Sequence, residues 1–180
     1  MSEAGRPCVA DPGAVLVELA HREGIRVVAL PGPSAILMAL MASGLGGQNF
    51  SFNGYLPADE PGREKALREL ERRSAETGST QIFIETPYRN EAMLKSALKA
   101  LDGGTTLSVA YALSSTEESV RTMSIASWRG GKAAYGKLPA VFILSAKTAP
   151  KGNHSQAKDN RGQPRGYPGQ GKAARPYRRP

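Results

Sequence analysis

The chain has 180 residues, of which 40% are hydrophobic, and its 24 Lys and Arg outnumber its 16 Asp and Glu to give a net charge of +8. This composition supplies enough apolar side chains for a folded core and excludes a chain that is disordered throughout. No stretch reaches the roughly 20 consecutive apolar residues that a membrane-spanning helix needs, which excludes a transmembrane protein.

The first residues, MSEAGRPCVADPG, have neither a basic region nor an apolar region, so we expect no secretory signal peptide. The single cysteine, Cys8, has no internal partner for a disulfide and suits a reducing, cytoplasmic compartment. Most cysteines of this kind are small buried residues, and we expect the same of Cys8. His21 and His154 are far apart in the sequence, so a zinc-type metal site is not expected.

The N-terminal third predicts a helix, a strand and a second helix. Asp11 is placed as the N-cap of the first helix and Pro12 at its first helical position. Residues 25–30, IRVVAL, form a β-branched run that predicts a buried strand. After the break at Pro-Gly-Pro, Ser34 can cap a helix over residues 35–43, which is apolar on nearly every side and therefore expected to be buried.

The rest of the body alternates between strand-like and helix-like patterns. Short β-branched or aromatic runs predict strands over residues 50–55, 81–85, 107–113, 120–124 and 139–145, and amphipathic stretches predict helices over residues 62–77 and 88–101. In the first of these helices, the pairs Glu64–Arg68 and Glu69–Arg73 indicate a solvated face rather than a ligand site. Strands interleaved with helices predict an α/β fold with helices on the faces of a sheet.

The composition changes near Pro150. From there to the C-terminus eight Lys and Arg stand against one Asp, with no Val, Ile, Leu, Met, Phe or Trp. Such a segment cannot bury enough apolar surface to fold, so we expect a disordered basic tail. Its arginines, glycines and two tyrosines, Tyr167 and Tyr177, are typical of sequence-tolerant RNA-binding tails, but a solubilising tail without a specific partner is equally consistent with them.

Three loops at predicted strand–helix junctions have unusual compositions: SEAGRPCVADPG, LPGPSA and ETPYRN. In open α/β sheets, ligands bind beyond the carboxyl ends of the strands, where such loops lie. Ordinary turn formation also accounts for their glycines and prolines. The sequence has no nucleophile elbow, phosphate loop or dinucleotide-binding motif. The residues alone therefore predict an α/β protein with a small-molecule crevice, without identifying its chemistry.

The order of these loops resembles the tetrapyrrole (corrin/porphyrin) methylase superfamily, in its branch of ribosomal RNA small-subunit methyltransferases. SEAGRPCVADPG is similar to the family's first signature, S-D-A-G-x-P-x-x-x-D-P-G, with Glu3 and Arg6 in place of the usual Asp and Thr. LPGPSA, with the apolar helix and SGL after it, resembles the second signature. NFSFNGYLP, ETPYR and LPAVFIL follow in the family's order, so the resemblance covers residues 2–147.

The resemblance implies two α/β domains with S-adenosylmethionine (SAM) in the cleft between them. Family members begin with a strand and a glycine-rich loop upstream of the first signature, so we expect an N-terminally truncated form of the fold here. Residues 1–30 would be a remnant of the N-terminal domain, its last helix and strand. Residues 31–148 would be the C-terminal domain, with a mixed sheet, and residues 149–180 the disordered basic tail.

The resemblance also implies a cofactor site. Its positions are Ala4, Gly5 and Pro7 along the cofactor, Ser34 and Ala35 near its carboxylate and ribose, Glu85 and Thr86 along the adenosine, and Leu113, Pro139 and Ala140 near the adenine. For Leu113 and Ala140, plain core packing is an equally good explanation.

Three residues are catalytic candidates. Glu3 or Glu85 could act as the base for a ribose hydroxyl, and the guanidinium of Arg89 suits an RNA phosphate. For Arg89, a surface salt bridge to Glu85 or Glu91 is the alternative.

The function implied is SAM-dependent methyl transfer to RNA, at a ribose 2′-hydroxyl of small-subunit ribosomal RNA, by a cytoplasmic homodimer whose tail contacts the RNA. The reactive methyl belongs to the cofactor, so the enzyme must mainly align and desolvate the acceptor, which agrees with a sequence lacking nucleophile and metal motifs. Two alternatives stay open: a tetrapyrrole or other small acceptor, and a non-catalytic binding or dimerisation fragment.

Overall fold

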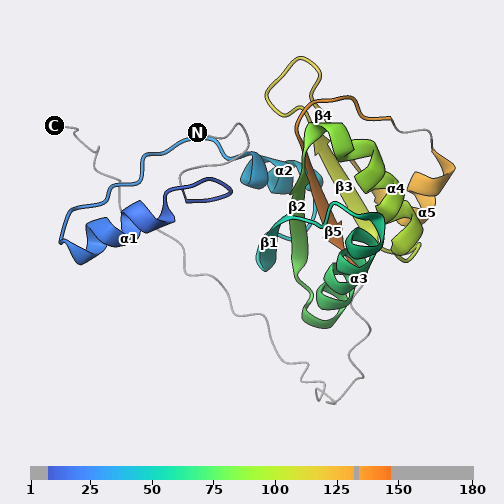
Figure 1. The fold of residues 1–180 in the computed structure, drawn as a ribbon. Coiled ribbons are helices and arrows are strands. Elements are labelled where there is room, and N and C mark those ends of the chain that lie inside the picture. The colour runs from blue at the N-terminus through green and yellow to red at the C-terminus, as the bar shows by residue number, and fades with distance from the viewer. Residues whose placement is uncertain (1–7, 132–133, 147–180) are drawn as a thin grey trace, which may run out of the picture.

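The computed structural model describes residues 8–131 and 134–146. At its centre lies a mixed sheet of five strands in the order β1-β2-β5-β3-β4 (Figure 1). The strands are β1 (Phe50–Tyr55), β2 (Thr80–Glu85), β3 (Thr106–Tyr111), β4 (Ser119–Ser124) and β5 (Ala140–Ser145). β1 and β2 are parallel, and the other neighbours are antiparallel. The predicted α/β fold with a mixed sheet is confirmed.

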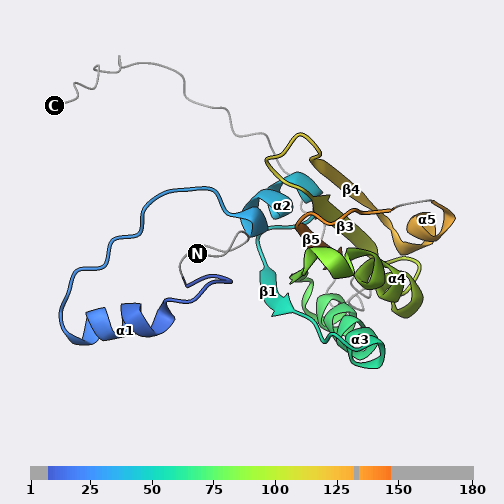
Figure 2. The ribbon, with the colours of Figure 1, turned by 45° about the horizontal axis from the view of Figure 1, so that its top comes forward.

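Helices cover both faces of this sheet. On one face lie α3 (Glu60–Thr77), α4 (Asn90–Ala100) and α5 (Ile125–Gly130), and on the other lies α2 (Ala35–Ser43) (Figures 1 and 2). A short 3₁₀ turn, η1 (Pro87–Arg89), joins β2 to α4. The remaining helix, α1 (Ala14–Arg22), lies apart from the sheet.

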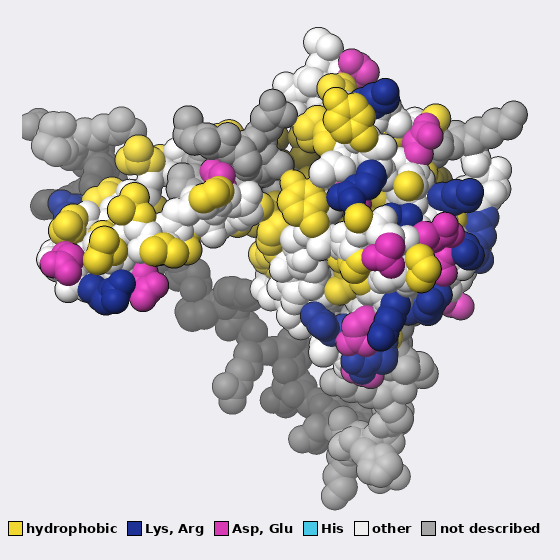
Figure 3. All heavy atoms as spheres, in the orientation of Figure 1, with side chains coloured by type: hydrophobic (Ala, Val, Ile, Leu, Met, Phe, Trp, Pro, Cys, Tyr) yellow, Lys and Arg dark blue, Asp and Glu magenta, His cyan; other side chains and the backbone are white. Residues whose placement is uncertain are grey.

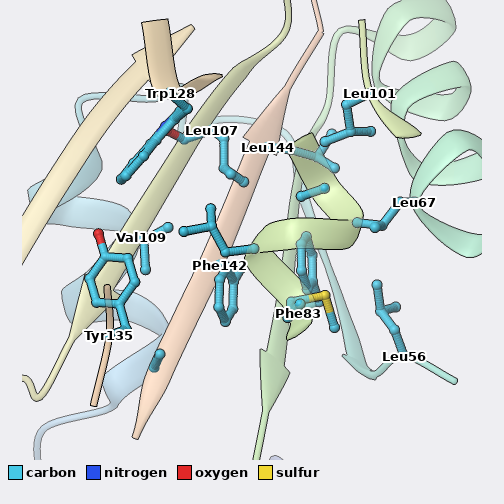
Figure 4. Close-up of a cluster of buried hydrophobic side chains, with 14 of the residues drawn as sticks. Leu56, Leu67, Phe83, Leu101, Leu107, Val109, Trp128, Tyr135, Phe142 and Leu144 are labelled. Carbon is cyan, nitrogen blue, oxygen red and sulfur yellow. The ribbon is translucent and has the colours of Figure 1, made fainter. Parts of the chain in front are cut away.

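The three inner strands β2, β5 and β3 supply most of the core residues of the sheet because each is covered on both faces. Along β2, Phe83 faces α3 and α4 while Ile82 and Ile84 face α2, as the alternation of a strand requires. The ring of Phe83 stacks on that of Phe142 in β5 with 5.5 Å between centroids (Figure 4). Strands buried on both sides are apolar along their whole length, which explains why their patterns are easily recognised.

Helix α3 shows how local chemistry fixes an element. Its N-cap Asp59 accepts a hydrogen bond from the Gly62 amide at 2.7 Å, so the helix begins at Glu60 rather than at residue 62. The two predicted i,i+4 pairs form, with Arg–Glu distances of 3.6 and 3.8 Å. The solvated face is nevertheless incomplete, because Arg63 is buried and donates from Nε to Ser96 Oγ at 2.9 Å.

The region before α2 differs most from the prediction. Helix α1 begins at Ala14 with Gly13 at the N-cap, so Asp11 and Pro12 lie outside it. Gly13 has φ = 137°, a conformation that glycine adopts readily, and this explains the later start. Cys8 is exposed rather than buried.

The predicted strand over residues 25–30 is absent: the segment is exposed and pairs with none of the described strands. Helix α2 has the predicted bounds, with Ser34 at its N-cap and Gly44 ending it at φ = 71°. Its burial is one-sided, because Ile36, Ala39 and Leu40 face the sheet, whereas Leu37 and Met41 are 49% and 83% exposed.

The predicted bounds of one strand and one helix also differ from the observed ones, because a turn lies at an end of each. β3 ends at Tyr111, not at residue 113, because Ala112 and Ser114 have φ values of 52° and 66° that end an extended strand. The helix predicted over residues 88–101 is η1 followed by α4.

Helix α5 was not predicted. It is capped by Ser124, whose hydroxyl accepts from the Ser127 amide, and anchored by Trp128, whose indole N–H donates to the Leu107 carbonyl at 2.9 Å.

The predicted tail, residues 149–180, lies outside the described residues. No helix in the described part of the chain is long and apolar enough to cross a membrane. In the same part of the chain, His, Cys, Asp and Glu side chains form no group of three or more that could hold a metal ion.

Candidate functional site

A pocket of about 160 Å³ opens at one end of the sheet, on the side that carries α2. Strands β1, β2 and β3 end here, while the antiparallel strand β5 begins here, with Ala140 paired to both Glu85 and Tyr111. The lining residues are mostly apolar: Ala35, Tyr55, Ile84, Glu85, Ala110, Ala112, Leu113, Ser115, Leu138, Pro139, Ala140 and Val141. The pocket therefore lies at the carboxyl ends of strands, where α/β proteins bind ligands.

Glu85 is the one charged residue among those that line the pocket, and its side chain is fully buried. Its Oε1 accepts hydrogen bonds from the Thr86 amide at 2.7 Å and from Arg89 Nε at 2.9 Å. Its Oε2 is buried and has no hydrogen-bond partner in the described part of the chain. A buried oxygen without a partner costs about 1–3 kcal/mol, so Oε2 is well suited to accept a hydrogen bond from a ligand.

Arg89, the last residue of η1, forms a salt bridge with this carboxylate. Its Nη2 lies 2.6 Å from Glu85 Oε1, and its Nε also donates to Thr86 Oγ1 at 3.1 Å. The Arg89 side chain is 34% exposed, so the pair joins a buried carboxylate to the molecular surface. Of the two interpretations of Arg89, the geometry matches the salt bridge, with Glu85 rather than Glu91 as its partner.

A buried asparagine fixes the segment that leads into β5. Asn90 Nδ2 donates to the carbonyl oxygens of Gly136 at 3.2 Å and Leu138 at 2.8 Å. The Pro139 carbonyl in turn accepts from the Ala112 amide at 2.9 Å. These bonds hold the pocket wall formed by Leu138 and Pro139 against the end of β3.

The structure brings together half of the predicted cofactor positions. Ala35, Glu85, Leu113, Pro139 and Ala140 all line the pocket. Ser34 and Thr86 are half-buried neighbours of lining residues. Glu3, Ala4, Gly5 and Pro7 lie outside the described residues.

Among the polar contributors to the pocket region, the sequence missed Tyr55 and Ser115, which line it, and Asn90, which braces it. It also missed five apolar lining residues: Ile84, Ala110, Ala112, Leu138 and Val141. Asn90 directly follows ETPYR, and its place right after a signature loop at a strand end is a signal that could have found it. Tyr55, the last residue of β1, and Ser115, between β3 and β4, meet only because of the arrangement of the strands, and no local pattern marks them.

Comparison with known proteins connects the sequence with this fold. The proteins named Ribosomal RNA small subunit methyltransferase I from Vibrio cholerae and Pseudomonas aeruginosa are 40% and 34% identical to the chain over 126 and 158 residues. These matches cover 70% and 86% of the chain but 42% and 55% of the relatives, so the chain spans about half the length of the curated relatives it matches.

Among solved structures, the methyltransferase CobJ matches with a TM-score of 0.52 and 22% identity, over 79% of this chain and 62% of CobJ. At this identity the likeness shows a shared fold. The family model described as Tetrapyrrole (Corrin/Porphyrin) Methylases matches residues 1–128, well over half of the sequence. The chain therefore belongs to the tetrapyrrole methylase family, as its loop signatures predict.

Proposed function

We propose that this chain is the C-terminal part of a SAM-dependent methyltransferase that acts on a ribose 2′-hydroxyl of small-subunit ribosomal RNA. The observation that carries the proposal is the pocket, which is mostly apolar and is lined by Glu85, whose buried Oε2 has no hydrogen-bond partner among the described residues. The names of the two bacterial relatives support ribosomal RNA as the acceptor.

The residues of the pocket fit the adenosine part of the cofactor. A purine has two apolar faces, which match walls such as Ile84, Leu113 and Val141. Adenosine also carries an exocyclic amine and ribose hydroxyls, and any of these can donate to Glu85 Oε2. At about 160 Å³ the pocket is smaller than the roughly 300–1,000 Å³ of typical ligand sites. We therefore propose that it forms one wall of a larger cleft.

SAM, when bound, supplies an electrophilic methyl group on its sulfonium. The part of the site described here orients the ligand: Arg89 and Thr86 fix the Glu85 carboxylate, and Asn90 fixes the opposite wall. Methylation of a hydroxyl releases its proton, so a base is needed near the acceptor oxygen. We assign Glu85 to binding because its Oε1 is already engaged, which leaves Glu3 as the other candidate for the base.

We propose the domain division that the resemblance implies: residues 1–30 from the first domain, 31–148 as the second, and 149–180 as a tail. The exposed apolar surface of residues 8–30, which we call the arm, supports this division (Figure 3). Val15, Leu16 and Val28 are 76%, 71% and 58% exposed, and α1 buries none of its residues. A complementary α/β domain would cover this surface and form the second wall of the cleft.

We propose further that the protein is a cytoplasmic homodimer and that its basic tail binds RNA. Leu37 and Met41 on the outer side of α2 are apolar and exposed, which supports contact with a second copy. An electrostatic tail predicts that binding to generic RNA weakens steeply with salt and is mostly lost when residues 151–180 are deleted.

Calorimetry with SAM tests the cofactor site. We expect weak or undetectable binding to this chain, because one wall leaves most of a ligand hydrated, and recovery when the N-terminal part of the Vibrio cholerae relative is joined to it. The joined protein should also transfer labelled methyl groups from SAM to small ribosomal subunits. Transfer to a tetrapyrrole instead would overturn the RNA proposal, and micromolar SAM binding by the chain alone would overturn the requirement for a second wall.

Matched variants of the joined protein localise the site. Ala35→Trp should fill the pocket and abolish SAM binding, whereas Ala42→Trp, on an exposed position of the same helix, should not. Glu85→Gln should weaken SAM about tenfold or more, since a hydrogen bond to a charged group is worth about 1.5–3 kcal/mol. Circular dichroism checks that each variant is folded. Equal SAM affinity for Ala35→Trp and Ala42→Trp would place the cofactor elsewhere.

A further inference from the structure

An aromatic and basic surface borders the pocket, and of its three residues only Arg89 also serves the cofactor site just described. It consists of Tyr88 and Arg89 in η1 and Lys137 in the segment before β5, and we call it the rim. Tyr88 is 80% exposed, and the Lys137 ammonium lies over its ring, 5.5 Å from the centroid. A large exposed aromatic side chain paired with a cation is not explained by packing of the core.

The rim is continuous with the pocket. Arg89 contacts the pocket residue Glu85 at 2.6 Å, and Lys137 directly precedes Leu138, which lines the pocket. Asn90 ties the two segments together through its bond to the Leu138 carbonyl at 2.8 Å. The rim is therefore braced by a buried hydrogen bond at the mouth of the pocket.

The charge of the rim is positive. Glu85 compensates Arg89, but Lys137 forms no ion pair with any carboxylate in the described residues. The ammonium occupies one face of the Tyr88 ring, and with 80% of the residue exposed the other face is open to a ligand. A flat, open ring beside uncompensated positive charge matches the two parts of a nucleotide, its base and its phosphate.

We propose that the rim binds single-stranded RNA, with a base stacked on Tyr88 and the adjoining phosphate at Lys137. The inference rests on the proposed RNA methyltransferase function and names where the acceptor strand contacts this domain. Sequence-tolerant binding of single strands combines aromatic stacking with backbone cations, and the rim contains both. A protein partner would have to place an acidic residue at Lys137 beside a stacking group, whereas every nucleotide of RNA carries a phosphate beside a base, so RNA is the better match.

The stacking step is tested in the full chain with a short single-stranded RNA that contains 2-aminopurine. Tyr88→Ala should weaken binding about 5- to 150-fold, which corresponds to about 1–3 kcal/mol for one stacked base, and should abolish the quenching of the fluorescent base. Tyr88→Phe keeps the ring and should retain both. Because Tyr88 is exposed, we expect both variants to fold, and circular dichroism verifies this.

The phosphate step is tested by salt dependence. Lys137→Ala should reduce the slope of log affinity against log salt by about 0.7, the value for one phosphate contact on a single strand. Lys65→Ala removes another exposed lysine, on α3 and outside the rim, and should leave the slope unchanged. An equal reduction in both variants would show a general effect of net charge and overturn the assignment of Lys137.

Other outcomes separate this inference from the proposed function. If RNA affinity is unchanged in both rim variants but lost on deletion of residues 151–180, the rim inference is wrong while the methyltransferase proposal stands. If Tyr88→Ala changes the sedimentation coefficient but not RNA affinity, the rim is a protein interface. If rim variants weaken RNA binding but the joined protein transfers no methyl group, the rim is confirmed and the proposed function fails.

Discussion

The arm and the sheet contain the same kind of sequence in opposite environments. Residues 25–30, IRVVAL, and strand β5, AVFILS, are both short β-branched runs. β5 pairs with β2 on one side and β3 on the other, and its first five residues are buried. The segment 25–30 pairs with no described strand and is exposed. A β-branched run therefore shows that a segment can form a strand, and its neighbours decide whether it does.

The helices α1 and α2 repeat this contrast. Each has nine residues, and each is rich in Val, Ile, Leu, Met or Ala. α2 buries four residues, with Ile36, Ala39 and Leu40 packed against the sheet, whereas α1 buries none. In the arm, both the helix and the extended segment expose apolar surface. Because two adjacent elements both expose apolar surface, one further domain could cover both, which agrees with the proposed N-terminal domain.

The largest expected difference between the two regions is in stability. Phe142→Ala removes a fully buried ring from the stack with Phe83 and should lower the free energy of unfolding by about 3–5 kcal/mol. Leu16→Ala in the arm removes a side chain that is 71% exposed and should change it by no more than about 0.5 kcal/mol. Urea denaturation of both variants measures the difference. A comparable loss for Leu16→Ala would mean that the arm is packed in solution.

The next largest expected effect is the loss of stability when the salt bridge between Arg89 and the pocket residue Glu85 is removed. Arg89→Ala leaves the buried Glu85 carboxylate with the Thr86 amide but without its guanidinium, which should cost about 1–3 kcal/mol of stability. Arg73→Ala is the matched control, because both side chains of its pair with Glu69 at 3.8 Å are exposed and the pair contributes about 0–1 kcal/mol. Chemical denaturation compares the two. Equal losses of stability in the two variants would show that the buried salt bridge of Glu85 stabilises the fold no more than an exposed one does.

A third expected difference between the arm and the sheet is in the rate of amide hydrogen exchange, which is measured without mutation. Amides of β2 and β5 lie in ladders at the centre of the sheet and should exchange with solvent only on global unfolding. Residues 26–29 have no strand partner in the described sheet, so their amides should exchange orders of magnitude faster. Hydrogen exchange followed by mass spectrometry measures both. When the joined protein is made, slow exchange should spread to these residues, and its failure to do so would contradict the docking of the arm.

The sequence predicted the elements whose partners lie within the chain. β1 and α2 were placed with the observed bounds, and the other strands of the sheet were placed within two residues. The errors have physical causes. The strand over residues 25–30 failed for lack of a partner, and α5 was missed because IASWRG has no helical periodicity and depends on the burial of Trp128.

For the pocket, the loop signatures located Ala35, Glu85 and Pro139, because the resemblance fixes the identity of loops at strand ends. They could not show that the two carboxylate oxygens of Glu85 differ in their hydrogen bonds. This difference arises because Arg89, in η1, donates to Oε1 and leaves Oε2 without a partner in the described residues. Tyr55 ends β1 and Ser115 lies between β3 and β4, so their meeting is set by the order of strands in the sheet. Such features are tertiary, and no window of the sequence contains them.

The smallest expected change in the free energy of unfolding comes from removing the buried hydroxyl of Tyr135. Tyr135 is 6% exposed, and its ring contacts Tyr111 with 5.3 Å between centroids. Its hydroxyl has no hydrogen-bond partner in the described residues. Tyr135→Phe keeps the ring contact and removes the unpartnered group, so the free energy of unfolding should be unchanged or rise by about 1 kcal/mol at neutral pH. A loss of stability would instead show that the hydroxyl is satisfied in solution.

The same residue predicts a pH dependence. Burial raises the pKa of Tyr135 above the ordinary value near 10, with a smaller opposing influence of Arg121. As the pH rises past that ordinary value, the unfolded chain loses the Tyr135 proton while the folded chain keeps it. The unfolded state then binds fewer protons, and stability falls with rising pH until the folded pKa is passed. Tyr135→Phe should remove this contribution, so the stability difference between variant and wild type should widen above pH 10. A constant difference across the alkaline range, measured by urea denaturation at each pH, would show that the hydroxyl titrates as it does in water.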